Sequence, residues 1–149
     1  MSGATPGTTP DNRRLLGIDY GERRIGLAVS DPTGTIATPV GHLLRRAGKR
    51  APVAALVRHA TELGATGFVL GLPLDADGRE PARAAEVRLV GAELTKRTGL
   101  PVRYVDERFT TAIALRAVRT VGGSTRGRKG DVDALAATVL LQHALALPG

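Results

Sequence analysis

RLLGIDYGERRIGLAVS, residues 14–30, contains two short apolar runs on either side of a polar turn. The runs are Leu15–Ile18 and Ile25–Val29, and the turn is Tyr20–Arg24. Short apolar runs joined in this way predict a β-hairpin. A second turn signal follows at residues 31–34, so we expect a third strand over residues 35–44 and an opening three-stranded meander.

The hydrophobic pattern changes its period after this meander. Val53, Leu56, Val57 and Ala60 recur at helical spacing, and Gly64 stands where a left-handed C-terminal cap is expected. This spacing predicts the first helix.

A short continuous apolar run, Phe68–Leu70, comes next and is typical of a strand covered on both faces. Between Pro81 and Thr98 an apolar stripe again has helical spacing, and Gly99 with Pro101 ends it. Residues 102–105 then predict a fifth strand.

The remaining chain predicts helices and one basic loop. Thr110 or Thr111 can cap a helix that runs through Val118, residues 122–130 form a glycine-rich loop, and a final helix runs from Asp131 to about Leu147. The order βββαβαβα predicts an α/β fold, a mixed five-stranded sheet flanked by helices.

Composition agrees with one intracellular domain. A chain of 149 residues that is 42% hydrophobic suits one domain with a single hydrophobic core. We expect this domain to comprise residues 13–149. Residues 1–12 are polar and should be a flexible tail, neither signal peptide nor membrane anchor. The net charge of +7 favours polyanionic partners, and the absence of cysteine suits a cytoplasmic protein.

Asp19 directly follows an apolar strand, where a carboxylate needs hydrogen bonds, a cation or solvent. It is either part of a hairpin turn or a metal ligand. Asp133 is followed by Ala136, Ala137 and Leu140 at helical spacing, so it should project toward the sheet. Small alanines would let this helix approach closely. Asp131, in contrast, suits an N-cap.

Asp106 and Glu107 end the fifth strand, and strand alternation sends their side chains to opposite faces. Only one of them should therefore reach a shared centre, and Asp106 can instead pair with Arg108 on the surface. Three carboxylates gathered from distant segments would repel one another unless a hard cation, Mg²⁺ or Mn²⁺, joined them. Two such ions about 4 Å apart can promote phosphodiester hydrolysis.

Basic residues cluster in two places. The loop at residues 122–130 can close over a phosphate backbone or remain a solvated loop. A second group is either a phosphate patch or a soluble surface, and comprises Arg45, Arg46, Lys49 and Arg50. The three histidines have no ligand spacing, and we assign them no role; they are His42, His59 and His143.

Four segments together resemble the motif series of the YqgF family, also called RuvX. They are residues 19–31, 71–78, 106–111 and 133–137, and the resemblance covers nearly all of the chain after the tail. The resemblance implies a ribonuclease-H-like fold, a relation to Holliday junction resolvases, and a role in maturing the 5′ end of pre-16S ribosomal RNA.

The resemblance also implies roles for individual residues. Asp19 would be the first-strand metal ligand, Asp133 the final-helix ligand, and Asp106 or Glu107 the remaining catalytic acid, with Glu107 placed in the metal set. We expect nearby basic residues to bind nucleic acid; they are Arg23, Arg24, Arg108, Arg126, Arg128 and Lys129.

The sequence departs from the family pattern in two places, and from related resolvases in a third. Asp75 and Ala76 replace the usual Asn and Met, and Phe109 replaces a leucine, so substrate contacts there can differ. Related resolvases place an acid at the end of the fourth strand, where this chain has Gly71 followed by Leu72 and Pro73.

Three other functions compete with an RNA-processing nuclease. The same site can serve a Holliday junction resolvase that cleaves branched DNA. The Asp-x-Gly at the first hairpin also marks ATP-binding modules of this fold, although their two lobes need a longer chain. An inactive nucleic-acid-binding protein is the third. The chain can act as a monomer or a homodimer.

Overall fold

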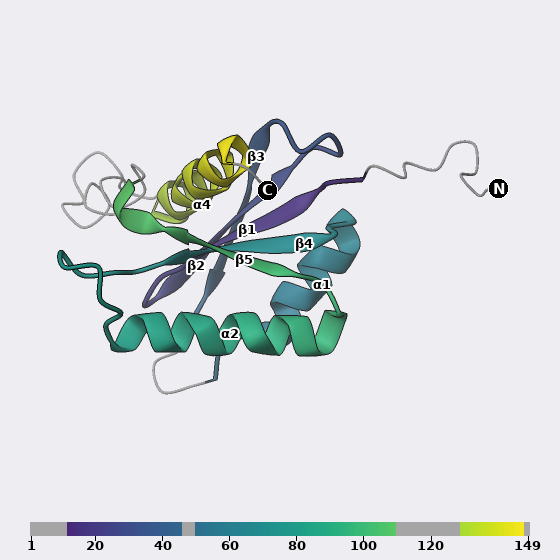
Figure 1. The fold of residues 1–149 in the computed structure, drawn as a ribbon. Coiled ribbons are helices and arrows are strands. Elements are labelled where there is room, and N and C mark those ends of the chain that lie inside the picture. The colour runs from purple at the N-terminus through teal and green to yellow at the C-terminus, as the bar shows by residue number, and fades with distance from the viewer. Residues whose placement is uncertain (1–11, 46–49, 110–128, 148–149) are drawn as a thin grey trace, which may run out of the picture.

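The computed structural model describes residues 12–45, 50–109 and 129–147, which build one mixed sheet with helices on both faces (Figure 1). The strand order is β3-β2-β1-β4-β5. The first three strands form an antiparallel meander, and β4 and β5 run parallel to β1. The strands are β1 Leu15–Tyr20, β2 Arg24–Ser30, β3 Ala37–Leu44, β4 Gly67–Leu72 and β5 Val102–Asp106.

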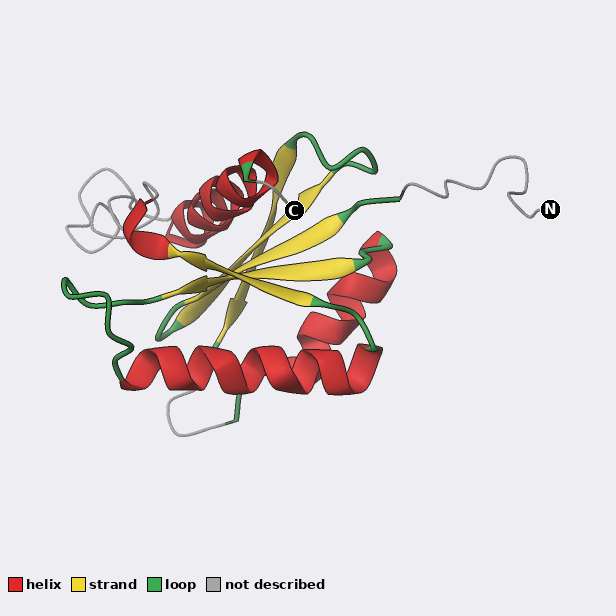
Figure 2. Cartoon of the chain, viewed as in Figure 1, coloured by secondary structure: helices red, strands yellow, loops and turns green. Residues whose placement is uncertain are grey.

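The helices divide between the two faces of the sheet (Figure 2). One face carries α1 (Val53–Leu63) and α2 (Ala82–Thr98), and the other carries α4 (Lys129–Ala146). A single 3₁₀ turn, η1 (Glu107–Phe109), follows β5. The predicted α/β architecture and the five-stranded mixed sheet are confirmed.

The strands bury different residues on the two faces because successive side chains alternate. Leu16, Ile18 and Tyr20 of β1 join the larger core, which α1 and α2 cover. The opposite face of β1 presents Gly17 and Asp19 to α4. Asp19 is thus directed away from the larger core by the same alternation that buries its neighbours.

Glycine caps end both helices of the larger core. Gly64 has φ 71°, and its N–H donates to the carbonyl oxygens of Ala60 and Thr61. Gly99 has φ 74° and closes α2. Both stops were predicted from the sequence, since only glycine adopts this conformation without steric cost.

The third strand starts at Ala37 rather than Thr35. The Asp31 carboxylate accepts hydrogen bonds from the backbone N–H groups of Thr35 (2.8 Å) and Ile36 (3.0 Å). These donors are therefore already used within the turn. The sheet ladder begins at the next residue, Ala37, which pairs with Ser30.

The final helix packs very closely on the sheet. A Cβ atom at Gly17 would lie 2.8 Å from Leu141 Cβ, and one at Gly26 would lie 1.9 Å from the Asp133 carbonyl oxygen. The helix contributes Ala136 and Ala137 to this contact, both fully buried. The close approach predicted from the small residues of this helix is confirmed, and glycines of β1 and β2 make it possible.

Some sequence predictions fall outside the described residues. These are the helix through Val118, most of the basic loop, and the tail up to residue 11. The final helix begins at Lys129, two residues before the expected start, so Lys129 and Gly130 belong to the helix and not to the loop. Asn12 donates a hydrogen bond to the Gly64 carbonyl oxygen. Among the helices of the described segments, none is long and apolar enough to cross a membrane.

Candidate active site

Asp19 and Asp133 meet on the α4 face of the sheet. Asp19 lies directly opposite Gly26 in the β1–β2 ladder, and cross-strand partners project to the same face. A Cβ atom added to Gly26 would clash with the backbone of Asp133, so Asp133 lies directly over Gly26. Both carboxylates are buried, each residue being 1% exposed. Two acids 114 positions apart in the sequence therefore lie at the same end of α4.

Glu107 reaches this site across the space above Gly71. A Cβ atom at Gly71 would lie 3.0 Å from Glu107 Oε1 and 2.8 Å from Leu140 Cδ1 of α4. Ile18 pairs with Leu70 in the parallel β1–β4 ladder, so the register places Gly71 beside Asp19. Glu107 is 3% exposed. Gly71 thus leaves the room that the Glu107 carboxylate occupies next to Asp19.

This packing explains the glycine at the end of the fourth strand. Glu107, in the turn after β5, brings a carboxylate over this position. A Cβ atom at residue 71 would meet Leu140 Cδ1 at 2.8 Å and crowd the Glu107 side chain at 3.0–3.1 Å. Gly71 and Glu107 are therefore coupled, because the glycine leaves the space that the glutamate side chain fills.

Asp106 lies on the other face and is held by Arg108. The Arg108 guanidinium donates to both carboxylate oxygens of Asp106 at 2.8–3.2 Å. This hydrogen bonding lowers the pKa of Asp106. Arg108 also donates to the carbonyl oxygens of Asp75 (3.2 Å) and Ala76 (3.5 Å), so the pair fastens the loop after β4. The structure brings Glu107, and not Asp106, to the buried acids.

The predicted nucleic-acid-binding residues have different positions. Arg23 and Arg24 lie in and beside the turn that follows Asp19, with Arg23 exposed to solvent. Arg108 is engaged by Asp106 and the loop after β4. Arg126 and Arg128 lie outside the described residues, and Lys129 begins α4.

Arg45 has a role that the sequence did not indicate. Its side chain is 15% exposed, pairs with Glu86 of α2 at 2.7 Å, and donates to the Gly21 carbonyl oxygen at 2.7 Å. Its guanidinium also lies 4.3 Å from the centre of the Tyr20 ring. Arg45 is therefore an internal contact and neither a phosphate patch nor a solvated surface.

A second arginine supports the same turn. Arg83 of α2 donates to the Tyr20 carbonyl oxygen at 2.9 Å. Arg45 and Arg83 thus hold the backbone immediately after Asp19 from two directions. Their partners are far away in sequence, and no local pattern could have identified them.

The donor chemistry of the acid site fits a hard divalent cation. Asp19, Glu107 and Asp133 offer carboxylate oxygens, which Mg²⁺ and Mn²⁺ prefer. Buried carboxylates also need a compensating positive charge. Within residues 12–45, 50–109 and 129–147, however, no three acidic, histidine or cysteine side chains already have the spacing of a finished metal centre. The structure gathers the three acids near the start of α4.

Comparisons with known proteins agree with this arrangement. The family model described as RuvX, Holliday junction resolvase, matches residues 13–147. Relatives described as candidate pre-16S rRNA nucleases include one from Nocardioides, which is 43% identical over 87% of this chain and 85% of its own length. One from Clavibacter michiganensis is 42% identical over 87% and 81%, and one from Acidiphilium cryptum is 40% identical over 94% and 88%.

A solved structure shares the fold. RuvC from Thermus thermophilus, determined in complex with a Holliday junction substrate, superposes with a TM-score of 0.52 and covers 89% of this chain and 92% of its own. It is 15% identical, so this likeness concerns the ribonuclease-H-like fold alone. Because the family model matches residues 13–147 and these three relatives are 40–43% identical, the chain belongs to the RuvX family.

Proposed function

We propose that this protein is a nuclease that hydrolyses phosphodiester bonds with Mg²⁺ or Mn²⁺ held by Asp19, Glu107 and Asp133. The observation that carries the proposal is the convergence of these buried acids on the α4 face. Family membership and the names of the relatives support the same chemistry.

The three acids divide the work of holding the cation. Asp19 and Asp133 come from elements packed in direct contact, so their backbones are fixed relative to each other. Glu107 stands on a 3₁₀ turn and its longer side chain adjusts the third position. When bound, the cation neutralises phosphate charge and stabilises the attacking and leaving oxygens. Arg23 and Arg24, beside Asp19, are placed to contact the flanking phosphates.

The proposed substrate is precursor 16S rRNA, cleaved at its 5′ end in the cytoplasm. This choice rests on relatives described as candidate pre-16S rRNA nucleases. The second candidate is a Holliday junction, favoured by the description of the matching family model. Both substrates present the same phosphodiester to the same acids, so a direct comparison has to decide.

The test compares Asp19→Asn with the wild-type chain on a precursor rRNA leader and on a four-way DNA junction. We expect cleavage of the RNA that requires Mg²⁺ or Mn²⁺ and that Asp19→Asn abolishes, with an unchanged circular dichroism spectrum. Glu62→Gln is the matched control, because Glu62 is an exposed acid on α1. Full activity of pure Asp19→Asn would refute the mechanism, and cleavage of the junction alone would refute the substrate.

Metal binding gives an independent readout. Mn²⁺ titration followed by electron paramagnetic resonance should show weaker binding in Asp19→Asn and in Asp133→Asn than in Glu62→Gln. Equal Mn²⁺ affinity in all three variants would exclude these acids as the ligands.

A further inference from the structure

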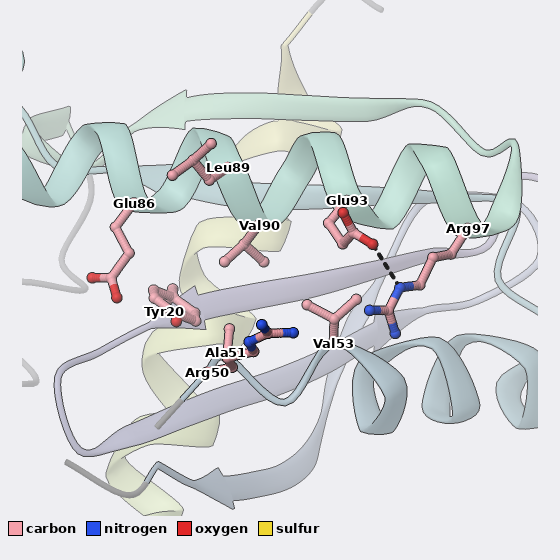
Figure 3. Close-up of a pocket in the computed structure, with 9 residues that line it drawn as sticks. All are labelled: Tyr20, Arg50, Ala51, Val53, Glu86, Leu89, Val90, Glu93 and Arg97. Carbon is pink, nitrogen blue, oxygen red and sulfur yellow. Dashed lines mark hydrogen bonds and ion pairs between the residues drawn. The ribbon is translucent and has the colours of Figure 1, made fainter. Parts of the chain in front are cut away.

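A pocket of about 370 Å³ lies on the face of the sheet opposite the acid site (Figure 3). It is bounded by α2, the start of α1 and the end of β1. Figure 3 shows Glu86, Val90 and Arg97 of α2 projecting toward the side occupied by Tyr20 and Val53. A pocket of this volume accepts a small organic molecule.

Tyr20 lines this pocket, and its hydroxyl oxygen is buried without a hydrogen bond to any of the described residues. The residue as a whole is 2% exposed. Glu86 is near, but outside hydrogen-bonding geometry. Burial raises the pKa of Tyr20 despite the opposing effect of Arg45, so the hydroxyl remains a donor at neutral pH. A buried hydroxyl without a partner is unfavourable, and a ligand in the pocket would satisfy it.

Among the charged residues that line the pocket, Arg50 has no ion pair with a described residue and is available to bind a ligand. Glu86 is paired with Arg45 at 2.7 Å, and Glu93 with Arg97 at 2.8 Å. Arg50 is exposed and has no ion pair with any described residue. The pocket therefore offers one guanidinium to an anion.

Apolar side chains provide the remaining surface. Val53 and Val90 are buried within the pocket lining, and Leu89 stands at its rim, 72% exposed. A flat apolar group packed against Val53 and Val90 would itself be removed from water. The site thus combines an apolar slot, a neutral donor and a cation.

We propose that this pocket binds a single nucleotide, its phosphate on Arg50, its base against Val53 and Val90, and a polar atom on the Tyr20 hydroxyl. The choice of a nucleotide among organic anions rests on the proposed function, since a nuclease works on nucleotide strands. The ligand is either a free 5′-mononucleotide or the 5′-phosphorylated end of an RNA strand. Both have the same chemistry at the pocket.

The test measures binding of each 5′-mononucleotide, and of a 5′-phosphorylated RNA trimer, to the full chain by calorimetry and by ¹H–¹⁵N NMR. We expect amide shifts at Tyr20, Leu89 and Val90. Arg50→Ala should weaken binding by about tenfold, the loss of one charge-assisted phosphate contact. Arg58→Ala, on α1, is the matched control and should bind as the wild type does. Tighter binding of the trimer would identify a strand end, and tighter binding of a mononucleotide a free ligand.

Tyr20→Phe removes only the hydroxyl. We expect weaker nucleotide binding with a melting temperature that is not lowered, because no protein hydrogen bond is lost. Absence of binding at millimolar nucleotide, or equal affinity in wild type, Arg50→Ala and Tyr20→Phe, would overturn the proposal. Asp19→Asn should bind the nucleotide normally, so failure of this site and failure of the proposed nuclease activity are separate results.

Discussion

Gly26 controls how closely α4 approaches the sheet, and Gly26→Ala tests this directly. The added methyl carbon would stand 1.9 Å from the Asp133 carbonyl oxygen, whereas ordinary van der Waals contact begins at 3.4 Å. The helix backbone would therefore have to retreat by about 1.5 Å. Its neighbours cannot absorb this by rotating a side chain, because the obstacle is the peptide group that carries Asp133.

The expected cost lies at the upper end of the usual range. Overpacking a core by one methyl group costs about 1–3 kcal/mol, and we expect about 3 kcal/mol here because backbone must move. The displacement also moves Asp133 away from Asp19. A misplacement of about 1 Å can reduce a catalysed rate about 100-fold, so we expect at least that loss of cleavage.

Urea unfolding followed by circular dichroism measures the stability, and two other glycines serve as controls. Gly17→Ala meets Leu141 Cβ at 2.8 Å and should cost less, about 1 kcal/mol. Gly64→Ala has nothing within 4 Å and should cost only its left-handed backbone, about 1 kcal/mol. If Gly26→Ala unfolded with the wild-type free energy and retained cleavage, the described helix–sheet contact would be wrong.

Three further changes test the site and its surroundings. Asp106→Asn should retain cleavage while Glu107→Gln abolishes it, measured on the same substrate; the reverse order would show that Asp106, and not Glu107, serves the reaction. Arg45→Met should lower the free energy of unfolding by about 2 kcal/mol and weaken Mn²⁺ binding, since it releases the turn after Asp19; unchanged Mn²⁺ affinity would contradict this positioning role. The hydrogen bonds from Ile36, Thr33 and Thr35 hold the pKa of Asp31 below its ordinary value, so Asp31 stabilises the fold above a pH of about 4 and this contribution disappears as the pH falls further. Urea titrations from pH 6 to pH 2 should therefore show a smaller decrease in the free energy of unfolding for Asp31→Asn than for the wild type. The same decrease in both proteins would contradict this contribution of Asp31.

Much of the fold could be predicted from local sequence. The hairpin around Asp19, the helix ending at Gly64 and the helix ending at Gly99 all appear where the pattern placed them. Their signals involve residues a few positions apart. Periodicity and capping act over the same short range as the hydrogen bonds that form a helix or a hairpin.

The candidate site could be predicted only in part. Alternation indicated that Asp106 and Glu107 face opposite ways, but it could not say which one turns toward the acids. Glu107 faces the acids because its side chain fits in the space above Gly71, whereas Asp106 is paired with Arg108. Arg45 was interpreted as a surface charge for the same reason, because Glu86 lies 41 positions away in the chain.

The sequence by itself determined the strands and helices, the glycine stops and the identity of the acids, since neighbouring residues encode these features. The tertiary structure alone decided that Asp19, Glu107 and Asp133 lie at one end of α4. Their approach depends on packing between segments far apart in the chain, and on glycines whose importance becomes visible only when another backbone rests on them.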